Sequence, residues 1–226
     1  MKVSLFRLIA SIPGGRTHFL PPIIKRIKRC NAFDKVILKR LASIISPKMQ
    51  NRGGYSFILG LHIGLSELLY NGTKLPSLEE LQKKEESYMF SPQVSVSNRR
   101  LVDHWDIKKP DEYHNKFANT RQPFLILNGA MDPQTPYFFA SFYYEKVKKN
   151  DLQHLVKFPN FVHGVFLHYE NSCAQMIITD WVKNPSRRPN IECIAKLPKI
   201  DWKGETEASK EFSKLIFSIE NMWENL

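Results

Sequence analysis

A carboxylate and an imidazole that together can move a proton lie about thirty residues apart in this chain. Asp132 follows the apolar segment Phe124–Leu127, and His163 follows a second apolar segment that ends at Phe158. A serine nucleophile needs an imidazole to accept its proton, and the imidazole needs a carboxylate on its other nitrogen to fix its tautomer and orientation. Taken singly, Asp132 fits a turn cap and His163 an ordinary loop histidine, but their shared context favours a catalytic pair.

The segments around these two residues are typical of neighbouring parallel strands. Phe124–Leu127 is a short continuous apolar run that ends at Asn128-Gly129, which favours a buried strand over a helix. A helix is predicted over Tyr137–Lys149, after two prolines that exclude an earlier start, and a second strand is predicted over His154–Phe158. Because loops at the carboxyl ends of parallel strands lie close together, this layout brings the acid and the histidine into contact.

Three motifs carry a more specific resemblance. The sequences FLILNGAMDPQTP, FVHGV and NSCAQMIITDWVKNPSRRPNIECI resemble the C-terminal part of the proline iminopeptidase and tripeptidyl aminopeptidase group of α/β-hydrolase serine peptidases. In that group a strand ends in a Gly-x-x-Asp-x-x-Thr-Pro loop, which corresponds here to Gly129, Asp132, Thr135 and Pro136. The resemblance implies that Asp132 is the triad acid and His163 the base, acting on a peptide through an acyl-enzyme without a metal or organic cofactor.

The resemblance covers most of this chain but only the back half of the family's protein. It implies an α/β fold, a partial α/β-hydrolase in which a helical cap precedes the last strands and helices of a parallel sheet. Residues 1–120 correspond to the cap and residues 121–200 to the core segment with the acid and base. For residues 201–226, apolar residues at helical spacing predict a C-terminal amphipathic helix. An N-terminal hydrolase half, with the first strands and the oxyanion hole, is then missing.

A triad also needs a nucleophile on a strand-to-helix turn, for which the signature is Gly-x-Ser-x-Gly. That pentapeptide does not occur in the 226 residues, and the nearest sequence is Gly64-Leu65-Ser66-Glu67-Leu68. Leu68 replaces the second glycine, and the preceding residues are predicted to be helical, so Ser66 is a poor candidate. We therefore predict a serine-peptidase-like chain of the aminopeptidase class that is inactive when isolated.

The resemblance also gives a substrate-binding role to Glu67. In the peptidase group the corresponding carboxylate lies near the free amino end of the substrate, where it selects a peptide terminus, because an unpaired buried ammonium is unfavourable. Glu67 fits equally well an ordinary glutamate in the first turn of a helix, where it interacts favourably with the helix dipole.

The chain is strongly basic, with a formal net charge of +11. Near its start it carries a cluster of cations: Lys25, Arg26, Lys28, Arg29, Lys35, Lys39 and Arg40. The alternative function is therefore a non-catalytic hydrolase-like module whose basic helices bind an anionic partner. No nucleic-acid-binding motif accompanies the charge, so solvated helix faces explain it better, and no nucleic-acid partner is expected.

Three cysteines leave the redox compartment open. Cys173 and Cys193 correspond to paired cysteines of the resembling group, and a bridge would contribute about 3 kcal/mol and fit a secreted or lysosomal location. Cys30 would then lack a partner. Three reduced cysteines packed as small hydrophobic residues are an equal alternative.

Several local expectations concern the rest of the chain. The longest apolar stretch, Tyr55–Leu65, is too short to span a membrane, and Met1–Ala10 makes a poor signal peptide. Helices are predicted from Asp34, as N-cap, and from a capping box of Ser77 with the glutamate three residues on. Ser91–Asn98 is predicted to be a linker.

Overall fold

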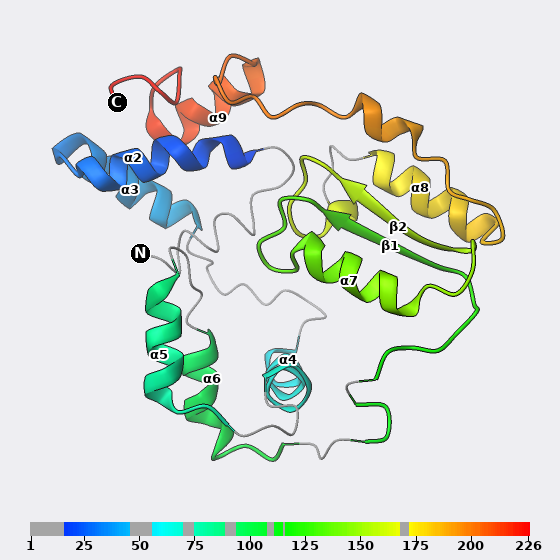
Figure 1. Cartoon of the computed structure of the whole chain (residues 1–226). Helices are drawn as coiled ribbons and strands as arrows, with labels where there is room; N and C mark the ends of the chain where they lie inside the picture. Colours follow the sequence, from blue (N-terminus) through cyan, green and yellow to red (C-terminus); the bar gives the residue numbers. More distant parts are fainter. Residues whose placement is uncertain are drawn as a thin grey trace. The chain divides into compact units, whose positions relative to one another are not determined.

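The computed structural model (Figure 1) describes residues 16–45, 56–69, 75–88, 94–107, 111–114, 116–167 and 172–226. Among them, residues 56–117 form one compact unit, and residues 16–45 and 118–226 form another. The expected signal-peptide region, residues 1–10, lies outside the described residues. Because residues 16–45 group with the sheet, the cap predicted for residues 1–120 does not coincide with one unit, and its role stays a prediction.

The sheet-containing unit is built around two parallel strands, as the sequence predicts. Strand β1 (Phe124–Gly129) pairs with β2 (Gln153–Phe158) in a register that begins at Phe124 opposite Gln153 and ends at Gly129 opposite Phe158. Helix α7 (Tyr137–Val147) connects them. Within the described residues, therefore, helices accompany a small parallel sheet, which is consistent with part of an α/β fold.

Helices cover both faces of this sheet (Figure 1). Helix α8 (Ser172–Lys183) contributes Cys173, Ala174 and Ile177 to a core that also contains Val156 and Phe158 of β2. On the other face, the ring of Phe124 meets Tyr144 of α7 edge-on, with centroids 6.3 Å apart. The short segments η3 (Val165–Leu167) and η4 (Glu192–Lys196) flank α8 along the chain. Apolar burial on both faces fixes the strand pair, and with it the loops that follow each strand.

Three helices form the other part of this unit. They are α2 (Leu20–Arg29), which follows the single turn η1 (Arg16–Phe19), then α3 (Ala32–Ile45) and α9 (Glu207–Phe217). Phe19 and Ile23 are fully buried together with Ile216 and Phe217 of α9. This packing explains why the apolar stripe of α2 leaves most of its cations facing solvent.

Helix α3 begins two residues earlier than the expected N-cap, Asp34. The side chain of Asn31 accepts a hydrogen bond from Asp34 N, and the carboxylate of Asp34 accepts one from Asn31 N, so Asp34 lies in the first turn of a reciprocal cap. Arg29 and Arg26 also hydrogen-bond this carboxylate. The hydrogen bonds from Arg29 outweigh burial and lower the pKa of Asp34 to about 2.

The other unit is helical in its described parts. Helix α4 (Phe57–Ile63) begins at Ser56, whose hydroxyl accepts a hydrogen bond from Leu59 N, and continues into the π-helical segment η2 (Gly64–Leu69). Helix α5 (Leu78–Ser87) has the predicted capping box, in which Ser77 and Glu80 exchange backbone and side-chain hydrogen bonds of 2.7 and 3.1 Å.

The linker predicted over Ser91–Asn98 is wrong in its described part, because helix α6 (Val94–Val102) begins there. The carboxylate of Glu85, on α5, accepts hydrogen bonds from Ser95 N and Val96 N at 3.1 and 3.4 Å. These N–H groups belong to the first turn of α6, where no intrahelical partner exists. The cap is supplied by a different helix, so the local sequence does not reveal it.

Candidate active site

Backbone hydrogen bonds hold the loops after β1 and β2 together. Ala130 N donates to Phe158 O at 2.9 Å, and Met131 N donates to Phe161 O at 3.0 Å. A side chain at Gly129 would place its Cβ 2.2 Å from Phe161 O and 2.5 Å from Val162 O. The glycine of the predicted motif is therefore required by the close approach of the two loops, which carry Asp132 and His163.

The structure brings Asp132 and His163 into direct contact. Asp132 Oδ2 lies 2.9 Å from His163 Nδ1, while Asp132 Oδ1 accepts hydrogen bonds from the backbone N–H groups of Gln134 and Thr135 at 2.8 and 2.9 Å. Asp132 thus caps its own turn and also contacts a histidine, and the catalytic role of the pair stays a prediction. The carboxylate side chain is 2 % exposed and the imidazole 36 % exposed.

The hydrogen bonds around Asp132 fix its charge and the histidine's tautomer. Burial raises the pKa of Asp132, but hydrogen bonds from Thr135, His163 and Gln134 together outweigh it, so the pKa lies below its ordinary value. The carboxylate is then ionised at neutral pH and only accepts hydrogen bonds. His163 Nδ1 must therefore carry the proton in this contact, which leaves Nε2 as the basic nitrogen of the neutral ring.

Two residues of the acid loop have roles that the sequence did not predict. The hydroxyl of Thr135 donates to Asp132 Oδ2 at 2.6 Å and lies 3.1 Å from His163 Nδ1. Asn128 Nδ2 donates to Thr135 O at 2.9 Å, which ties the loop back to the end of β1. Thr135 appeared in the sequence only as part of a motif, and Asn128 only as a turn former.

Ser66 does not occupy a nucleophile elbow. It is 2 % exposed and lies in η2, directly after helix α4, whereas the elbow follows a strand. Glu67 is an exposed residue of the same segment. Both belong to the helical unit, and the substrate-binding role of Glu67 stays a prediction.

Of the two alternatives for the cysteines, the structure has the disulfide that the resemblance implies. Cys173, on α8, is bonded to Cys193, in η4, with Cα atoms 5.6 Å apart. The bridge links α8 to η4. Both cysteines also pack in the apolar cluster that contains Val156 and Phe158 of β2. Cys30 is exposed and has a free thiol.

The basic cluster near the start of the chain is partly used inside the fold. Arg26 is completely buried, and Arg29 forms an ion pair with the buried Asp34 at 2.8 Å. Arg40 hydrogen-bonds the side chain of Ser218. These contacts account for three of the cluster's cations, and binding of an anionic partner by the remainder stays a prediction.

Comparison with known proteins supports the hydrolase relationship. Residues 87–193 match the model of a family described as TAP-like protein, an α/β-hydrolase family, and this segment includes Asp132, His163 and both bridged cysteines. The match spans slightly less than half of the chain. It supports a hydrolase-like function, in agreement with the parallel strands. No curated protein and no solved structure matches the chain.

Two further classes of site concern the parts of the chain that the structure describes. None of the helices there is long and apolar enough to cross a membrane. Nor do three or more histidine, cysteine or acidic side chains gather there in a way that could hold a metal ion.

Proposed function

We propose that this chain carries the acid and base of a serine-type α/β-hydrolase that cleaves peptides through an acyl-enzyme. The observation that carries the proposal is the 2.9 Å contact between Asp132 Oδ2 and His163 Nδ1 at the ends of paired parallel strands. In this role His163 Nε2 accepts the proton of a serine hydroxyl and then gives it to the departing amine. Asp132 stays ionised and stabilises the imidazolium that forms between these steps.

The surroundings of the pair are consistent with His163 as the group that moves the proton and Asp132 as the fixed carboxylate. Asp132 is held by the backbone of its own loop and by Thr135, so the carboxylate cannot turn away when the imidazole becomes charged. The partly exposed imidazole can meet a substrate, whereas the buried carboxylate cannot. Glu67 would bind the amino end of the peptide in an aminopeptidase of this kind, and this assignment rests on the resemblance alone.

The nucleophile is not among the recognisable motifs of this sequence. Ser66 fails both tests for an elbow serine, since Leu68 replaces a glycine and a helix precedes it. We infer that the isolated chain binds and orients a substrate but does not form an acyl-enzyme, because the covalent step requires a nucleophile.

The tautomer of His163 tests the acid–base assignment. In ¹⁵N-labelled full-length chain near pH 9, where imidazoles are neutral, we expect His163 to carry its proton on Nδ1. The variant Asp132→Asn should redistribute the proton between the two nitrogens, because the charged acceptor is gone. His163→Gln assigns the signals. A wild-type ring protonated on Nε2 would overturn the proposed role.

A fluorophosphonate probe tests the missing nucleophile. The isolated chain should remain unlabelled, and the variant Ser66→Ala should behave identically. Covalent modification of Ser66 in the wild type, abolished by His163→Gln, would show instead that the chain is a complete serine hydrolase.

A further inference from the structure

A cavity lies at the start of β2, toward the other end of this strand from the His163 loop. It has a volume of about 270 Å³ and is lined by Tyr144, Lys148, Asp151, Gln153, His154, Leu155, Val156, Arg188, Pro189 and Ile191. Pockets for drug-sized ligands run from about 300 to 1,000 Å³, so this one suits a smaller molecule. The residues of the candidate active site do not line it.

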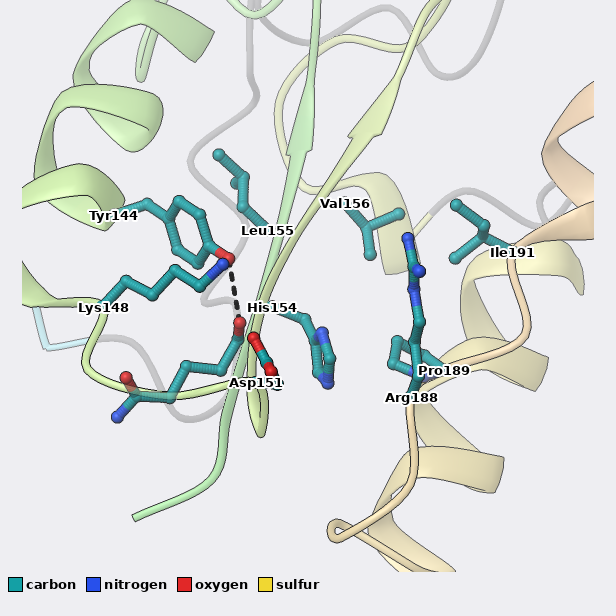
Figure 2. A pocket seen from close by; sticks show the side chains of 10 residues that line it. Tyr144, Lys148, Asp151, His154, Leu155, Val156, Arg188, Pro189 and Ile191 are labelled. Carbon is teal, nitrogen blue, oxygen red and sulfur yellow. Dashed lines mark hydrogen bonds between the residues drawn. The ribbon is translucent and has the colours of Figure 1, made fainter. Parts of the chain in front are cut away.

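Two cations approach this cavity from different elements. Lys148 follows the last residue of α7 and Arg188 lies in the segment after α8, so each side chain comes from the segment that follows one of the helices covering opposite faces of the sheet. Figure 2 shows the His154 ring between Asp151 and the Arg188 side chain, with Lys148 beside Tyr144. Both side chains are exposed, and within the described parts of the chain neither forms an ion pair, although the Lys148 ammonium lies 5.6 Å from the centre of the Tyr144 ring.

The pKa of His154 responds to the charges that line the cavity. Burial lowers its pKa, the charges of Arg188 and Lys148 lower it further, and Asp151 acts in the opposite direction. In the described structure His154 Nε2 is buried and lacks a hydrogen-bond partner. A neutral imidazole among unpaired cations is an arrangement that an entering anion would improve in two ways, by pairing the cations and by allowing the ring to take up a proton.

We propose that this cavity binds a phosphate group, which Lys148 holds from the α7 side of β2 and Arg188 from the α8 side. The guanidinium offers two parallel N–H donors that match two phosphate oxygens, and the ammonium supplies a point charge for a third. The lining carries two cations and one carboxylate, Asp151, so its net charge is positive and favours an anion, and the guanidinium geometry favours a phosphate among anions. The tyrosine hydroxyl already donates to Gln153 O at 2.9 Å, so it remains available only as an acceptor.

The test uses inorganic phosphate and the NMR signals of His154 in the full-length chain. At constant ionic strength, phosphate should raise the pKa of His154 saturably, because the bound anion offsets the charges of Lys148 and Arg188. His154→Gln assigns the signals. The signals of His163 should not move, so this site is tested separately from the catalytic assignment.

Matched variants locate the binding residues. Arg188→Ala should raise the pKa of His154 without phosphate and weaken phosphate binding about tenfold or more, as expected for loss of a charge-assisted pair of hydrogen bonds. Arg187→Ala removes the same charge from the adjacent residue, which is exposed like Arg188 but does not line this cavity, and should leave binding within about twofold. Lys148→Gln should weaken binding less than Arg188→Ala.

Three results would overturn the proposal. The first is a His154 pKa that phosphate leaves unchanged or shifts no more than chloride does at the same ionic strength. The second is equal saturable binding of acetate, which would make the cavity a carboxylate site. The third is an equal loss in Arg187→Ala and Arg188→Ala, which would indicate diffuse attraction of anions to a basic surface.

Discussion

Asp132 and Asp201 lie in two loops of the same compact unit that share their construction. Each carboxylate accepts backbone N–H groups of its own loop and the hydroxyl of a threonine, Thr135 at 2.6 Å in one and Thr206 at 2.8 Å in the other. Near each loop is a histidine, His163 or His18. Burial raises the pKa of each carboxyl, and the hydrogen bonds outweigh it, so both pKa values lie below the ordinary value.

The two loops differ in how the histidine is attached. His163 contacts its carboxylate directly, whereas His18 Nε2 lies 3.0 Å from Ser209 Oγ. That oxygen lies 2.9 Å from the hydroxyl of Thr206, which in turn hydrogen-bonds Asp201. In these contacts hydroxyl groups separate His18 from the carboxylate, so Asp201 does not orient the ring by direct contact as Asp132 orients His163. His18 and Ser209 are also buried, at 4 % and 3 % exposure.

This difference shows that a serine within reach of a histidine is not by itself a catalytic arrangement. The Asp201 cluster joins η1 to the first turn of α9, where the side chain of Ser209 is buried. The Asp132 cluster instead presents a histidine whose partner carboxylate is fixed behind it. The two clusters therefore make different predictions for stability and for the tautomer of the histidine.

Replacing the glycine of each loop with alanine should give the largest difference in folding stability between the two loops. Gly129→Ala should lower the free energy of unfolding by about 3 kcal/mol or more, because its Cβ would meet backbone carbonyls that cannot move without breaking the loop contact. Gly204→Ala, at φ +70° and 3.1 Å from the flexible side chain of Met222, should cost about 1–2 kcal/mol.

Urea unfolding followed by the histidine NMR signals of this unit measures both glycine variants. Equal losses at the two positions would contradict the idea that the Asp132 loop, and not the Asp201 loop, depends on close backbone approach.

Replacing each histidine with alanine should reverse the order of destabilisation, so that the Asp201 cluster shows the larger loss in the free energy of unfolding. His18→Ala should cost about 2–3 kcal/mol, because it leaves a cavity and removes the partner of a buried hydroxyl. His163→Ala should cost less than about 1 kcal/mol, since that ring is partly exposed. The same unfolding experiment serves, and a larger loss for His163→Ala would mark the pair as structural rather than poised for chemistry.

The sequence predicted the Asp132 cluster and missed the Asp201 cluster for one physical reason. Both strands of the sheet are short apolar runs with turn residues after them, so their existence and the proximity of the following loops can be inferred locally. His18 and Ser209 are 191 residues apart, and only the packing of η1 against α9 brings them together. The cap that Glu85 supplies to α6 was missed in the same way.

The details within the Asp132 loop show a finer limit. The sequence identified Thr135 as a motif position, yet its hydroxyl lies on both Asp132 and His163, which depends on side-chain rotamers that no pattern encodes. Gly129 was noted as part of the motif, and its reason, the carbonyl oxygens of the histidine loop, appears only in three dimensions. Residue types and order could thus be inferred, whereas contacts between the two loops could not.

The smallest expected effect is on the pH dependence of stability, to which the two carboxyl groups contribute. A carboxyl whose pKa is lower in the folded state stabilises the fold above its unfolded pKa near 3.8, and this contribution is lost as the pH falls toward the folded value. Asp201→Asn should therefore be less stable than the wild type by about 1 kcal/mol at pH 7, with the difference shrinking below about pH 4.

Asp132→Asn should show a loss of similar size and the same sign with pH, because it also removes an ionised acceptor from a capped loop. Only Asp132→Asn should change the tautomer of His163, and Asp201→Asn should leave it as in the wild type. If both variants alter that tautomer, the two clusters are coupled through the unit. The tautomer of His163 would then not be set by its direct contact with Asp132 alone.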